Sequence, residues 1–537
     1  MTKSGKNGRL LKNNFLMSLC ITALVLAPDF CLRLAGISKV GIDIVGFLFV
    51  YVVMLSASFM PKKVFWAILA LTFFMDSVEL HYMAYFGFPM NAFDISNVFK
   101  EAHEILETGL TVARYVWFIL PIMLAAYYAA IKVWGRFENR RRQGLVIPMI
   151  PLVWALGYTP YRTFKKPADS FYPGTVYHSL HNAVNAFSWW AFQSNTTVGI
   201  KWKPYRVEYA EKPDRPQTIV LAVGESINRN RLGIYGYGRD TTPKLAEFLS
   251  ENKGASVIKK GYSTAPATRD SLPLLFNQIA EPCNIDQLQS GDTNILKLAH
   301  DAGYATWVIS AQENNLFDRI TMKWADRIVL KETSATAGFK GRDDIIFDTI
   351  SKIDFTKGRN FIVFFTRSIH SPYSHSYDDR PEFRVWDEAA PTRMEATGNA
   401  YDNAVLYYDD MMARIFAKLR ERAPSLAIAF TSDHGEMLGE DGFYGHLLLE
   451  PRMFEVPYIY YSTGFSKPPK GEYISHAEMV RHLSSLMGYR ITDENMRLGE
   501  FYLSSGNIYQ ECRFIRGRKD ASGISLSEPL GPETLEK

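Results

Sequence analysis

Long apolar runs are concentrated in about the first 160 residues of the chain, whereas shorter runs alternate with polar segments after that point. A helix needs about 20 mostly apolar residues to cross the hydrocarbon core of a bilayer. Five segments are candidates for such helices: 15–32, 40–60, 64–86, 115–134 and 145–158. The fifth segment is short and contains Pro148 and Pro151. The pattern therefore predicts a transmembrane domain of about five helices over residues 1–160.

Basic residues predict the orientation of these helices. Lysines and arginines precede the first span and recur at Lys62–Lys63 and over residues 132–142, which fall in alternate connections. Connections rich in lysine and arginine stay in the cytoplasm. Further apolar segments follow the first span at once, which favours an uncleaved helix over a signal peptide. Five spans with a cytoplasmic N-terminus place everything after about residue 158 outside the cytoplasmic membrane, in the periplasm.

The second part of the chain shows the pattern of an α/β domain. Residues 161–215 are rich in aromatic residues and proline, which is typical of an interfacial linker. Short apolar runs then predict strands at 218–223, 305–309, 361–365, 426–430 and 456–461, and helical spacing predicts helices at 401–420 and 476–487. Continuous apolar strands separated by helices favour an α/β sandwich with a mostly parallel sheet over residues 216–537. The polar tail after about residue 518 is expected to be loose.

Composition excludes several classes of protein. Lys+Arg of 60 against Asp+Glu of 56 leaves a net charge of only +4, which argues against a nucleic acid as partner. The four cysteines, Cys20, Cys31, Cys283 and Cys512, include no Cys-x-x-Cys pair. A thiolate zinc ribbon, a thioredoxin motif and a disulfide-dense scaffold are therefore excluded.

Metal-binding side chains follow two of the predicted strands. Glu225 ends the run that begins at residue 218, and Asp433 and His434 end the run that begins at residue 426. Ligands of parallel α/β sheets bind beyond the carboxyl ends of the strands. Two carboxylates and one imidazole there predict a divalent metal site, and the imidazole favours zinc or manganese over magnesium or calcium.

A segment rich in hydroxyl groups lies between these two strands. Residues 261–273 contain Thr264, Thr268 and Ser271 and lead into a helical pattern. A hydroxyl group next to a metal ion is a nucleophile at neutral pH, and a helix N-terminus stabilises an incoming phosphate. Spacing alone does not choose among the three residues. His370 and His446 also follow strand ends, where an imidazole can neutralise phosphoryl oxygens or protonate a leaving group.

Two polar features lie in the part predicted to contact the membrane. Asn97 and Glu101 are four residues apart in a stretch that reads as an amphipathic helix, so they share one face of it. Asp76 and Glu79 lie near the outer end of the third predicted span. Asp76 and Glu79, with the nearby His81, are expected to be either interfacial polarity at a helix terminus or a polar patch near the lipid headgroups. Spacing alone favours a solvated helix face for Asn97 and Glu101.

Several motifs occur in one order over residues 218–488: Gly224-Glu225-Ser226 with Arg229, Leu232–Tyr237, Arg239, Thr241–Pro243, Thr268 with Ser271–Pro273, His370–Tyr373, Tyr401–Tyr407, and Ser432–Glu436 with His446. This series resembles the signature of bacterial phosphoethanolamine transferases, inner-membrane enzymes of the alkaline-phosphatase/sulfatase superfamily. The five-span N-terminal part also fits that family.

The resemblance implies zinc as cofactor and phosphatidylethanolamine in the bilayer as donor. It also implies a role for each matching residue: zinc ligands at Glu225, Thr268, Asp433 and His434, a covalent nucleophile at Thr268, phosphate-binding catalytic residues at His370 and His446, and headgroup contacts at Asn97 and Glu101. Phosphoethanolamine would then pass through Thr268 to a cell-envelope acceptor, either lipid A, the lipopolysaccharide core, a glucan or a protein.

The sequence departs from the family at two places, and both leave the acceptor open. Only Cys283 and Cys512 are available for a disulfide outside the membrane, and residues 312–318 contain no lysine where the family has one that binds phosphate. The alternatives are a glycerophosphate transferase or a membrane-tethered, metal-dependent phosphodiesterase of the same superfamily. A sulfatase is disfavoured because Cys283 lacks the expected motif, and a non-catalytic protein is disfavoured because every expected catalytic position is occupied.

Overall fold

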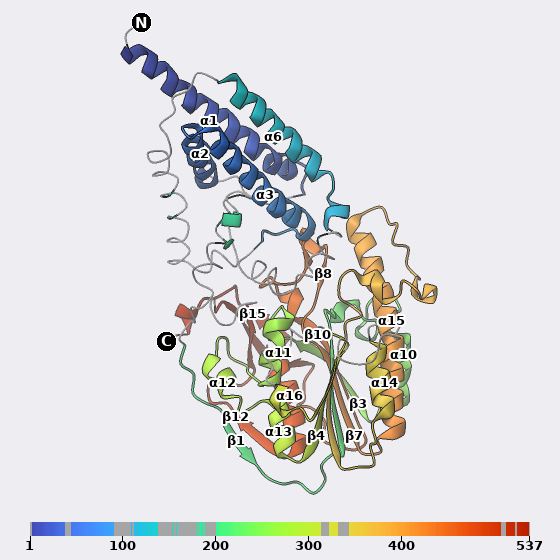
Figure 1. Ribbon diagram of the computed structural model, residues 1–537. Coiled ribbons are helices and arrows are strands. Elements are labelled where there is room, and N and C mark those ends of the chain that lie inside the picture. The colour runs from blue at the N-terminus through green and yellow to red at the C-terminus, as the bar shows by residue number, and fades with distance from the viewer. Residues whose placement is uncertain are drawn as a thin grey trace. The chain divides into compact units, whose positions relative to one another are not determined.

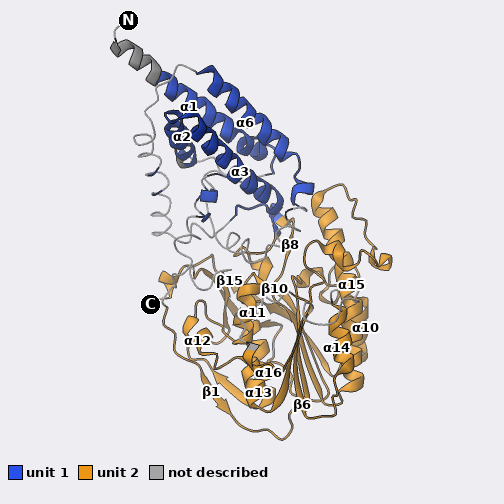
Figure 2. Cartoon of the chain, in the orientation of Figure 1, with its two compact units in different colours: residues 1–196, 441–444 blue, residues 197–440, 445–537 orange. Residues whose placement is uncertain are grey.

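The computed structural model describes residues 3–37, 44–90, 109, 112–137, 153, 157, 180, 182–184, 186–187, 200–312, 322–330, 343–505, 512–520 and 523–535. Asn97 and Glu101 lie outside these residues. The chain divides into two compact units (Figure 2): residues 1–196 with 441–444, and residues 197–440 with 445–537.

The first unit is helical. In the part of the chain that the structure describes, its helices are α1 (Lys3–Leu34), α2 (Ile44–Ser58), α3 (Lys62–Phe86) and α6 (Ile119–Arg136). They pack around a core that includes Val25, Val53, Leu69 and Met123, while other large apolar side chains lie on the outside of the helices. Within the described residues, Lys12–Leu34 and Lys62–Phe86 are long and apolar enough to cross a membrane, and Gly46–Ser58 is a shorter apolar helix. The fifth predicted span lies almost entirely outside the described residues.

The acidic residues of the third predicted span are buried inside this helical unit. Asp76 and Glu79, one turn apart on α3, are both fully buried. The hydroxyl of Tyr127 donates a hydrogen bond to Asp76 over 3.3 Å, and the amide of Asn182 donates one to Glu79 over 2.6 Å. Hydrogen bonds inside the bundle therefore offset part of the cost of burying these carboxylates.

An eight-stranded sheet forms the centre of the second unit (Figure 1). Its order is β11 (Tyr473–Ser475), β3 (Ser256–Tyr262), β10 (Glu455–Ser462), β7 (Leu426–Ser432), β2 (Thr218–Gly224), β6 (Arg359–Phe365), β4 (Tyr304–Ser310) and β5 (Arg327–Leu330). Only β10 runs against the other strands of this sheet. All five predicted strands are present, each with bounds within two residues of the predicted ones. The sheet is mostly parallel, as the apolar runs predict.

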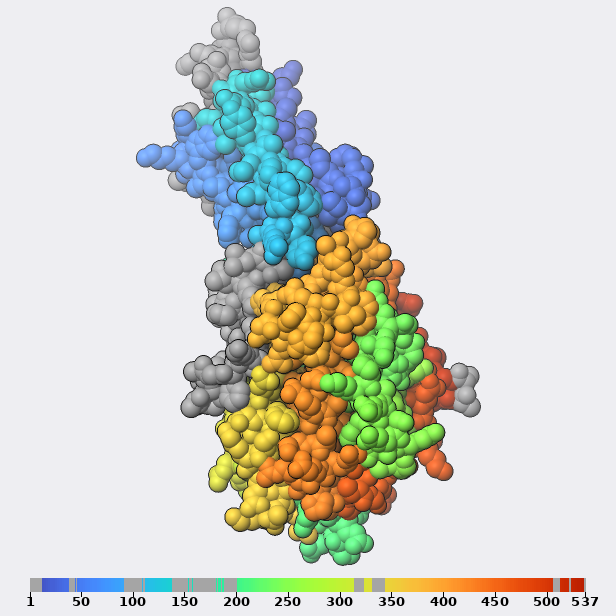
Figure 3. Space-filling view, turned by 90° about the vertical axis from the view of Figure 1, so that its right-hand side faces the viewer, coloured from blue at the N-terminus to red at the C-terminus, as the bar shows by residue number. Residues whose placement is uncertain are grey.

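Helices cover both faces of this sheet. One face carries α10 (Pro243–Glu251), α14 (Asp344–Lys352) and α15 (Arg393–Arg422), which lie on the side of the molecule seen in Figure 3. The other face carries α11 (Thr268–Phe276), α12 (Ile285–Ser290), α13 (Ile295–Asp301) and α16 (His476–Met487). Alternate residues of β2 enter the two cores: Val220 packs on the first side and Leu221 on the second. Burial on both faces explains why β2 reads as an unbroken apolar run.

Local signals fix the ends of the two helices that the sequence predicts. Thr392 and Glu395 form a capping box that begins α15, and Ser475 and Glu478 form one that begins α16. Gly488, with φ of 106°, ends α16 in the left-handed conformation that glycine adopts without steric cost. The predicted helix 476–487 matches α16, whereas α15 begins eight residues before the predicted residue 401.

Smaller elements complete the second unit. They are β1 (Arg206–Tyr209), which pairs with β12 (Tyr489–Thr492), the short strands β8 (Met437–Leu438) and β9 (Tyr444–Gly445), and a three-stranded sheet of β13 (Glu500–Ser504), β14 (Phe514–Asp520) and β15 (Gly523–Leu526). The expectation of a loose tail after residue 518 is wrong, because β14 and β15 pair through Leu526. Cys283 and Cys512 form a disulfide, and Cys20 and Cys31 are free.

Candidate active site

Two neighbouring parallel strands bring the predicted metal ligands together. Gly224, the last residue of β2, lies opposite Ser432, the last residue of β7. The amide of Asp433 donates a hydrogen bond to the carbonyl oxygen of Gly224 over 3.0 Å. Glu225 and Asp433 therefore leave the sheet side by side, as expected for equivalent ends of parallel strands.

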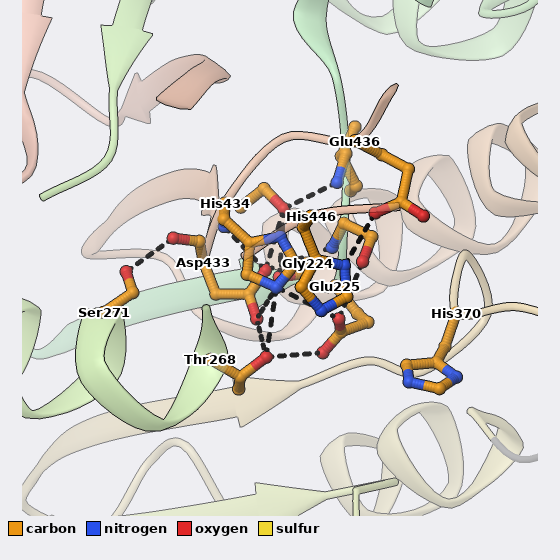
Figure 4. A network of polar contacts seen from close by, with 12 residues as sticks. Gly224, Glu225, Thr268, Ser271, His370, Asp433, His434, Glu436 and His446 are labelled. Atoms are coloured by element: carbon orange, nitrogen blue, oxygen red, sulfur yellow. Dashed lines mark hydrogen bonds and ion pairs between the residues drawn. The ribbon is translucent and has the colours of Figure 1, made fainter. Parts of the chain in front are cut away.

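The Thr268 hydroxyl lies in the middle of this group (Figure 4). Its oxygen is 2.7 Å from Oδ2 of Asp433, 3.2 Å from Nε2 of His434 and 3.4 Å from Oε2 of Glu225. Thr268 is the first residue of α11, so the positive end of the helix dipole lies at the hydroxyl. Ser271, one turn further on, instead donates to the carbonyl oxygen of Asp433 over 2.5 Å. Of the hydroxyl groups that spacing left open, Thr268 is therefore the one at the centre of the acidic group.

These residues have the donor atoms of a metal site. Glu225, Asp433 and His434 are all buried, and their ligand atoms lie within 4.8 Å of one another. Nδ1 of His434 is 2.8 Å from the carbonyl oxygen of Gly435, which only accepts, so Nε2 keeps its lone pair toward Thr268 and the carboxylates. Two buried carboxylates facing an imidazole lone pair and a hydroxyl suit a four-coordinate zinc ion.

Ser226 holds the two carboxylates in place. Its hydroxyl donates to Oε1 of Glu225 over 2.8 Å, and its amide donates to Oδ1 of Asp433 over 3.0 Å. These contacts require a φ of 58° at Ser226, a conformation that is uncommon for residues other than glycine. The Tyr401 hydroxyl, on α15, donates to the carbonyl oxygen of Ser226 and supports this turn. Strained backbone of this kind is concentrated at functional sites.

His446 lies beside His434 and is held by a carboxylate. The two imidazole rings are 4.2 Å apart between centroids, and Nδ1 of His446 lies 2.9 Å from Oε2 of Glu436. The Tyr373 hydroxyl donates to the other oxygen of Glu436 over 2.7 Å. Burial lowers the pKa of His446, but Glu436, Glu225 and Asp433 together outweigh it and raise the pKa to about 9. With His434, Glu436 and His446 also form a second group of possible metal ligands.

The pKa of His370 is shifted in the opposite direction. Burial, together with the nearby guanidinium of Arg367, lowers the pKa of His370 to about 3. Its Nδ1 lies 2.7 Å from the carbonyl oxygen of Ser371, which leaves Nε2 as the acceptor atom of a neutral ring. The pKa values of these two histidines are therefore shifted in opposite directions.

Sequence reasoning assigned no role to several residues that shape this site. Glu436 is part of the motif Ser432–Glu436, yet only its contact with His446 shows what it does. Gln312 donates to Oε2 of Glu225 over 2.7 Å, and Arg367 donates to Gln312 over 3.1 Å. Both follow predicted strands, so position at a strand end was the signal available in the sequence.

Comparisons with known proteins agree with this architecture. A family model described as sulfatase matches residues 217–489. The Kdo(2)-lipid A phosphoethanolamine 7''-transferase of Salmonella typhimurium is 25% identical over 334 residues, which cover 59% of this chain and 56% of that protein. Phosphoethanolamine transferase EptA of Helicobacter pylori is 23% identical over 437 residues, which cover 78% and 79%. The chain spans about half the length of the first curated relatives that it matches.

A solved structure has the same fold. The integral membrane protein lipooligosaccharide phosphoethanolamine transferase A from Neisseria meningitidis superposes with a TM-score of 0.58 at 20% identity, covering 89% of this chain and 95% of that chain. The match confirms the predicted fold class, an N-terminal helical part followed by an α/β sandwich with a mostly parallel sheet. Because the sulfatase model covers half of the sequence and includes both strand ends of the site, the chain belongs to the sulfatase family.

Proposed function

We propose that this protein transfers phosphoethanolamine from phosphatidylethanolamine to a cell-envelope acceptor through a covalent intermediate on Thr268. The observation that carries the proposal is the position of the Thr268 oxygen, 2.7 Å from Asp433 and 3.2 Å from His434. The relatives named phosphoethanolamine transferases support the choice of phosphoethanolamine as the transferred group.

Glu225, Asp433, His434 and Thr268 would hold one zinc ion. A bound zinc ion makes a hydroxyl group far more acidic and screens negative charge on a phosphoryl group. In this chain the Thr268 hydroxyl donates a hydrogen bond to Oδ2 of Asp433. This contact orients the Thr268 oxygen and provides an acceptor for the hydroxyl proton. Ser226 and Gln312 fix the Glu225 carboxylate from the other side.

The first step of the proposed reaction releases diacylglycerol. The Thr268 oxygen forms a bond to the donor phosphorus, and the bond from phosphorus to the diacylglycerol oxygen breaks. The departing oxygen needs a proton, and His446, whose pKa is raised to about 9, is the imidazole that carries one at neutral pH. The N-terminus of α11 stabilises the charge on the phosphoryl oxygens.

The second step returns the enzyme to its starting state. An acceptor oxygen forms a bond to phosphorus, and the bond between phosphorus and Thr268 breaks. His446, left neutral by the first step, accepts the proton of the acceptor, and the proton that Asp433 took returns to the Thr268 oxygen. His370, whose pKa is lowered to about 3, stays neutral and is proposed to lie at the phosphoryl group, as the resemblance implies. The acceptor is proposed to be an envelope glycolipid or glycan, with lipid A, the lipopolysaccharide core, a glucan and a protein as candidates.

The location of the donor supports a multi-pass inner-membrane protein whose second unit is periplasmic. A disulfide in that unit is typical of an oxidising compartment, and both free cysteines are in the helical unit. Asn97 and Glu101, between the third and fourth predicted spans, are proposed to contact the ethanolamine headgroup.

Mass spectrometry of the protein incubated with phosphatidylethanolamine tests the proposal. We expect a phosphoethanolamine adduct on Thr268, no adduct and no transfer in Thr268→Ala, and an unchanged adduct in the neighbouring hydroxyl variant Thr264→Ala. A wild-type rate of transfer in Thr268→Ala would refute the covalent route. A glycerophosphate adduct from phosphatidylglycerol, with none from phosphatidylethanolamine, would favour the alternative transferase.

Elemental analysis tests the metal separately. Asp433→Ala should lose zinc, because removal of one of three charged or imidazole ligands leaves the site under-coordinated. Asp292→Ala, which removes an exposed acid of the same unit, should keep it. Full zinc content in Asp433→Ala would contradict the ligand assignment.

A further inference from the structure

A small cavity lies directly after β6, next to the candidate active site. Its lining includes Arg367, His370, Ser371, His375 and Ser376. Its volume of about 20 Å³ leaves room for one water-sized atom. The lining residues that the structure describes offer guanidinium, imidazole and hydroxyl groups, and none of them carries a carboxylate. The guanidinium and hydroxyl donors of this lining suit one anionic oxygen.

Arg367 gives this cavity a fixed positive charge. The residue is 4% exposed, and an arginine side chain stays protonated in proteins. Its backbone amide donates to Oδ1 of Asp343 over 2.8 Å, and the amide of Ser368 donates to Oδ2 over 3.0 Å. Asp343 therefore holds the backbone, while the guanidinium donates to the neutral amide oxygen of Gln312. A charged donor in such a buried place makes strong hydrogen bonds to anions.

Gln312 connects this guanidinium to the nucleophile. Its Nε2 donates to Oε2 of Glu225 and to the carbonyl oxygen of Thr366, both over 2.7 Å. The same oxygen of Glu225 lies 3.4 Å from the Thr268 oxygen. The amide orientation is unambiguous, because each end of Gln312 meets the matching partner. Arg367 is therefore only two hydrogen bonds away from Glu225.

His370 lines the cavity, and in Figure 4 it lies to one side of the group around Thr268, with no contact drawn between them. Arg367 contributes to the low pKa of His370, which indicates that the guanidinium is close to this imidazole. A phosphorus atom at the cavity mouth would therefore lie near the catalytic residues, with one of its oxygens inside.

We propose that Arg367 anchors an anion subsite that binds one phosphate oxygen of a substrate beside Thr268. This inference rests on the proposed transferase function and adds a specificity-determining residue to it. Two groups offer such an anionic phosphate oxygen: the phosphodiester of the lipid donor and a phosphate group on the acceptor. No bond forms or breaks in the subsite, so its contribution is to binding and orientation.

Steady-state kinetics with Arg367→Gln and inorganic phosphate as a competing probe test the subsite. Loss of one hydrogen bond to a charged group predicts a KM increase of about 10- to 100-fold for one substrate, with a smaller change in kcat. An increase for phosphatidylethanolamine identifies the donor phosphodiester, and an increase for a phosphorylated acceptor identifies the acceptor phosphate. Inhibition by inorganic phosphate should weaken in parallel.

Control variants distinguish a loss of phosphate binding from a loss of folded structure. Arg384→Gln, on the exposed segment that follows β6, removes an arginine paired with Asp378 and should leave both KM values unchanged. Zinc content and melting temperature of Arg367→Gln show whether a purely structural role has been lost. Unchanged KM values and unchanged phosphate inhibition in a folded, zinc-loaded Arg367→Gln would overturn the proposal.

Two further variants cover the case in which Arg367→Gln does not fold. Arg367→Lys keeps the charge, and His375→Gln alters an exposed residue at the rim of the cavity. Both should weaken phosphate inhibition, and wild-type behaviour in both would refute the subsite. The failure of the proposed function is distinguishable: wild-type protein would then form no adduct on Thr268, whereas failure of the subsite alone leaves that adduct intact.

Discussion

At the scale of single residues, the roles of the two histidines follow from their neighbours. His446 is held by Glu436, and the Tyr373 hydroxyl holds the second oxygen of that carboxylate. A carboxylate on one ring nitrogen fixes the tautomer and the orientation of the imidazole. His370 instead lies near a guanidinium and against a backbone carbonyl. Burial lowers the pKa of both imidazoles, but at His446 the neighbouring carboxylates outweigh burial, so the pKa values of the two histidines are shifted in opposite directions.

Glu436→Gln tests this explanation. The variant keeps the size of the side chain but removes the charge that helps keep His446 protonated, so kcat should fall by about 10- to 100-fold while KM and zinc content stay the same. Kinetics and elemental analysis measure the two effects separately. Tyr373→Phe, which leaves the contact between Glu436 and His446 intact, should lose less activity. Equal losses in the two variants would show that the carboxylate charge is not the cause.

The sequence predicts some of these residues better than others. Glu225, Asp433 and His434 are found because strand ends of a parallel sheet meet at one edge, and that rule depends only on backbone topology. Glu436, Gln312 and Arg367 act through particular side-chain contacts across the site. Such contacts depend on rotamers and on loops far apart in the sequence, which no periodicity encodes.

At the scale of elements, buried strands and capped helices are predictable, whereas strands with mixed patterns are not. β2 and β7 are buried on both faces and therefore read as apolar runs. β3 contains Lys259, Lys260 and Gly261, and it pairs antiparallel with β10. Its position is set by pairing with β10 and β11 and not by its own composition. The same holds for the last two residues of β14 and for β15, which belong to the tail that was expected to be loose.

The disulfide between Cys283 and Cys512 connects two distant parts of the second unit. It links the segment just before α12 to the segment just before β14, across a sequence separation of 229 residues. Closing a long loop restricts the unfolded chain, so Cys283→Ser with Cys512→Ser should cost about 2–5 kcal/mol in the free energy of unfolding. Thermal melting of the two proteins measures this. Cys20→Ser, a free cysteine in the helical unit, serves as the control, and equal melting temperatures for all three proteins would contradict the prediction.

A buried carboxylate near this disulfide predicts a pH dependence. Burial, together with Asp493, raises the pKa of Glu281 to about 7, although Tyr205 and Asn495 donate hydrogen bonds to it. Between its unfolded value and about 7, the folded chain binds more protons than the unfolded chain, so stability falls as pH rises through this window. The melting temperature of Glu281→Gln should fall less between pH 5 and pH 8 than that of the wild-type protein. Asp409, whose pKa is also raised to about 7, remains in both proteins, so the difference between them reports Glu281.

At the scale of the whole molecule, the chemistry requires the second unit to face the side of the membrane that holds its substrates. Two helices within the described residues are long and apolar enough to cross a membrane. With the N-terminus in the cytoplasm, an even number of spans would place the second unit in the reducing cytoplasm, where disulfides are rare. An odd number places it outside. The disulfide and the distribution of basic residues therefore favour the same topology.

Reporter fusions test this topology directly. A reporter that is active only in the periplasm, fused after Lys201, should be active, and the same reporter fused within residues 136–142 should be inactive. A reporter that is active only in the cytoplasm should give the opposite pattern. Thiol labelling of intact cells provides an independent measurement, because Cys283 and Cys512 should resist labelling until a reductant is added. A cytoplasmic signal after Lys201 together with free thiols would separate the site from an outer-leaflet donor and would overturn the proposed reaction as well as the orientation.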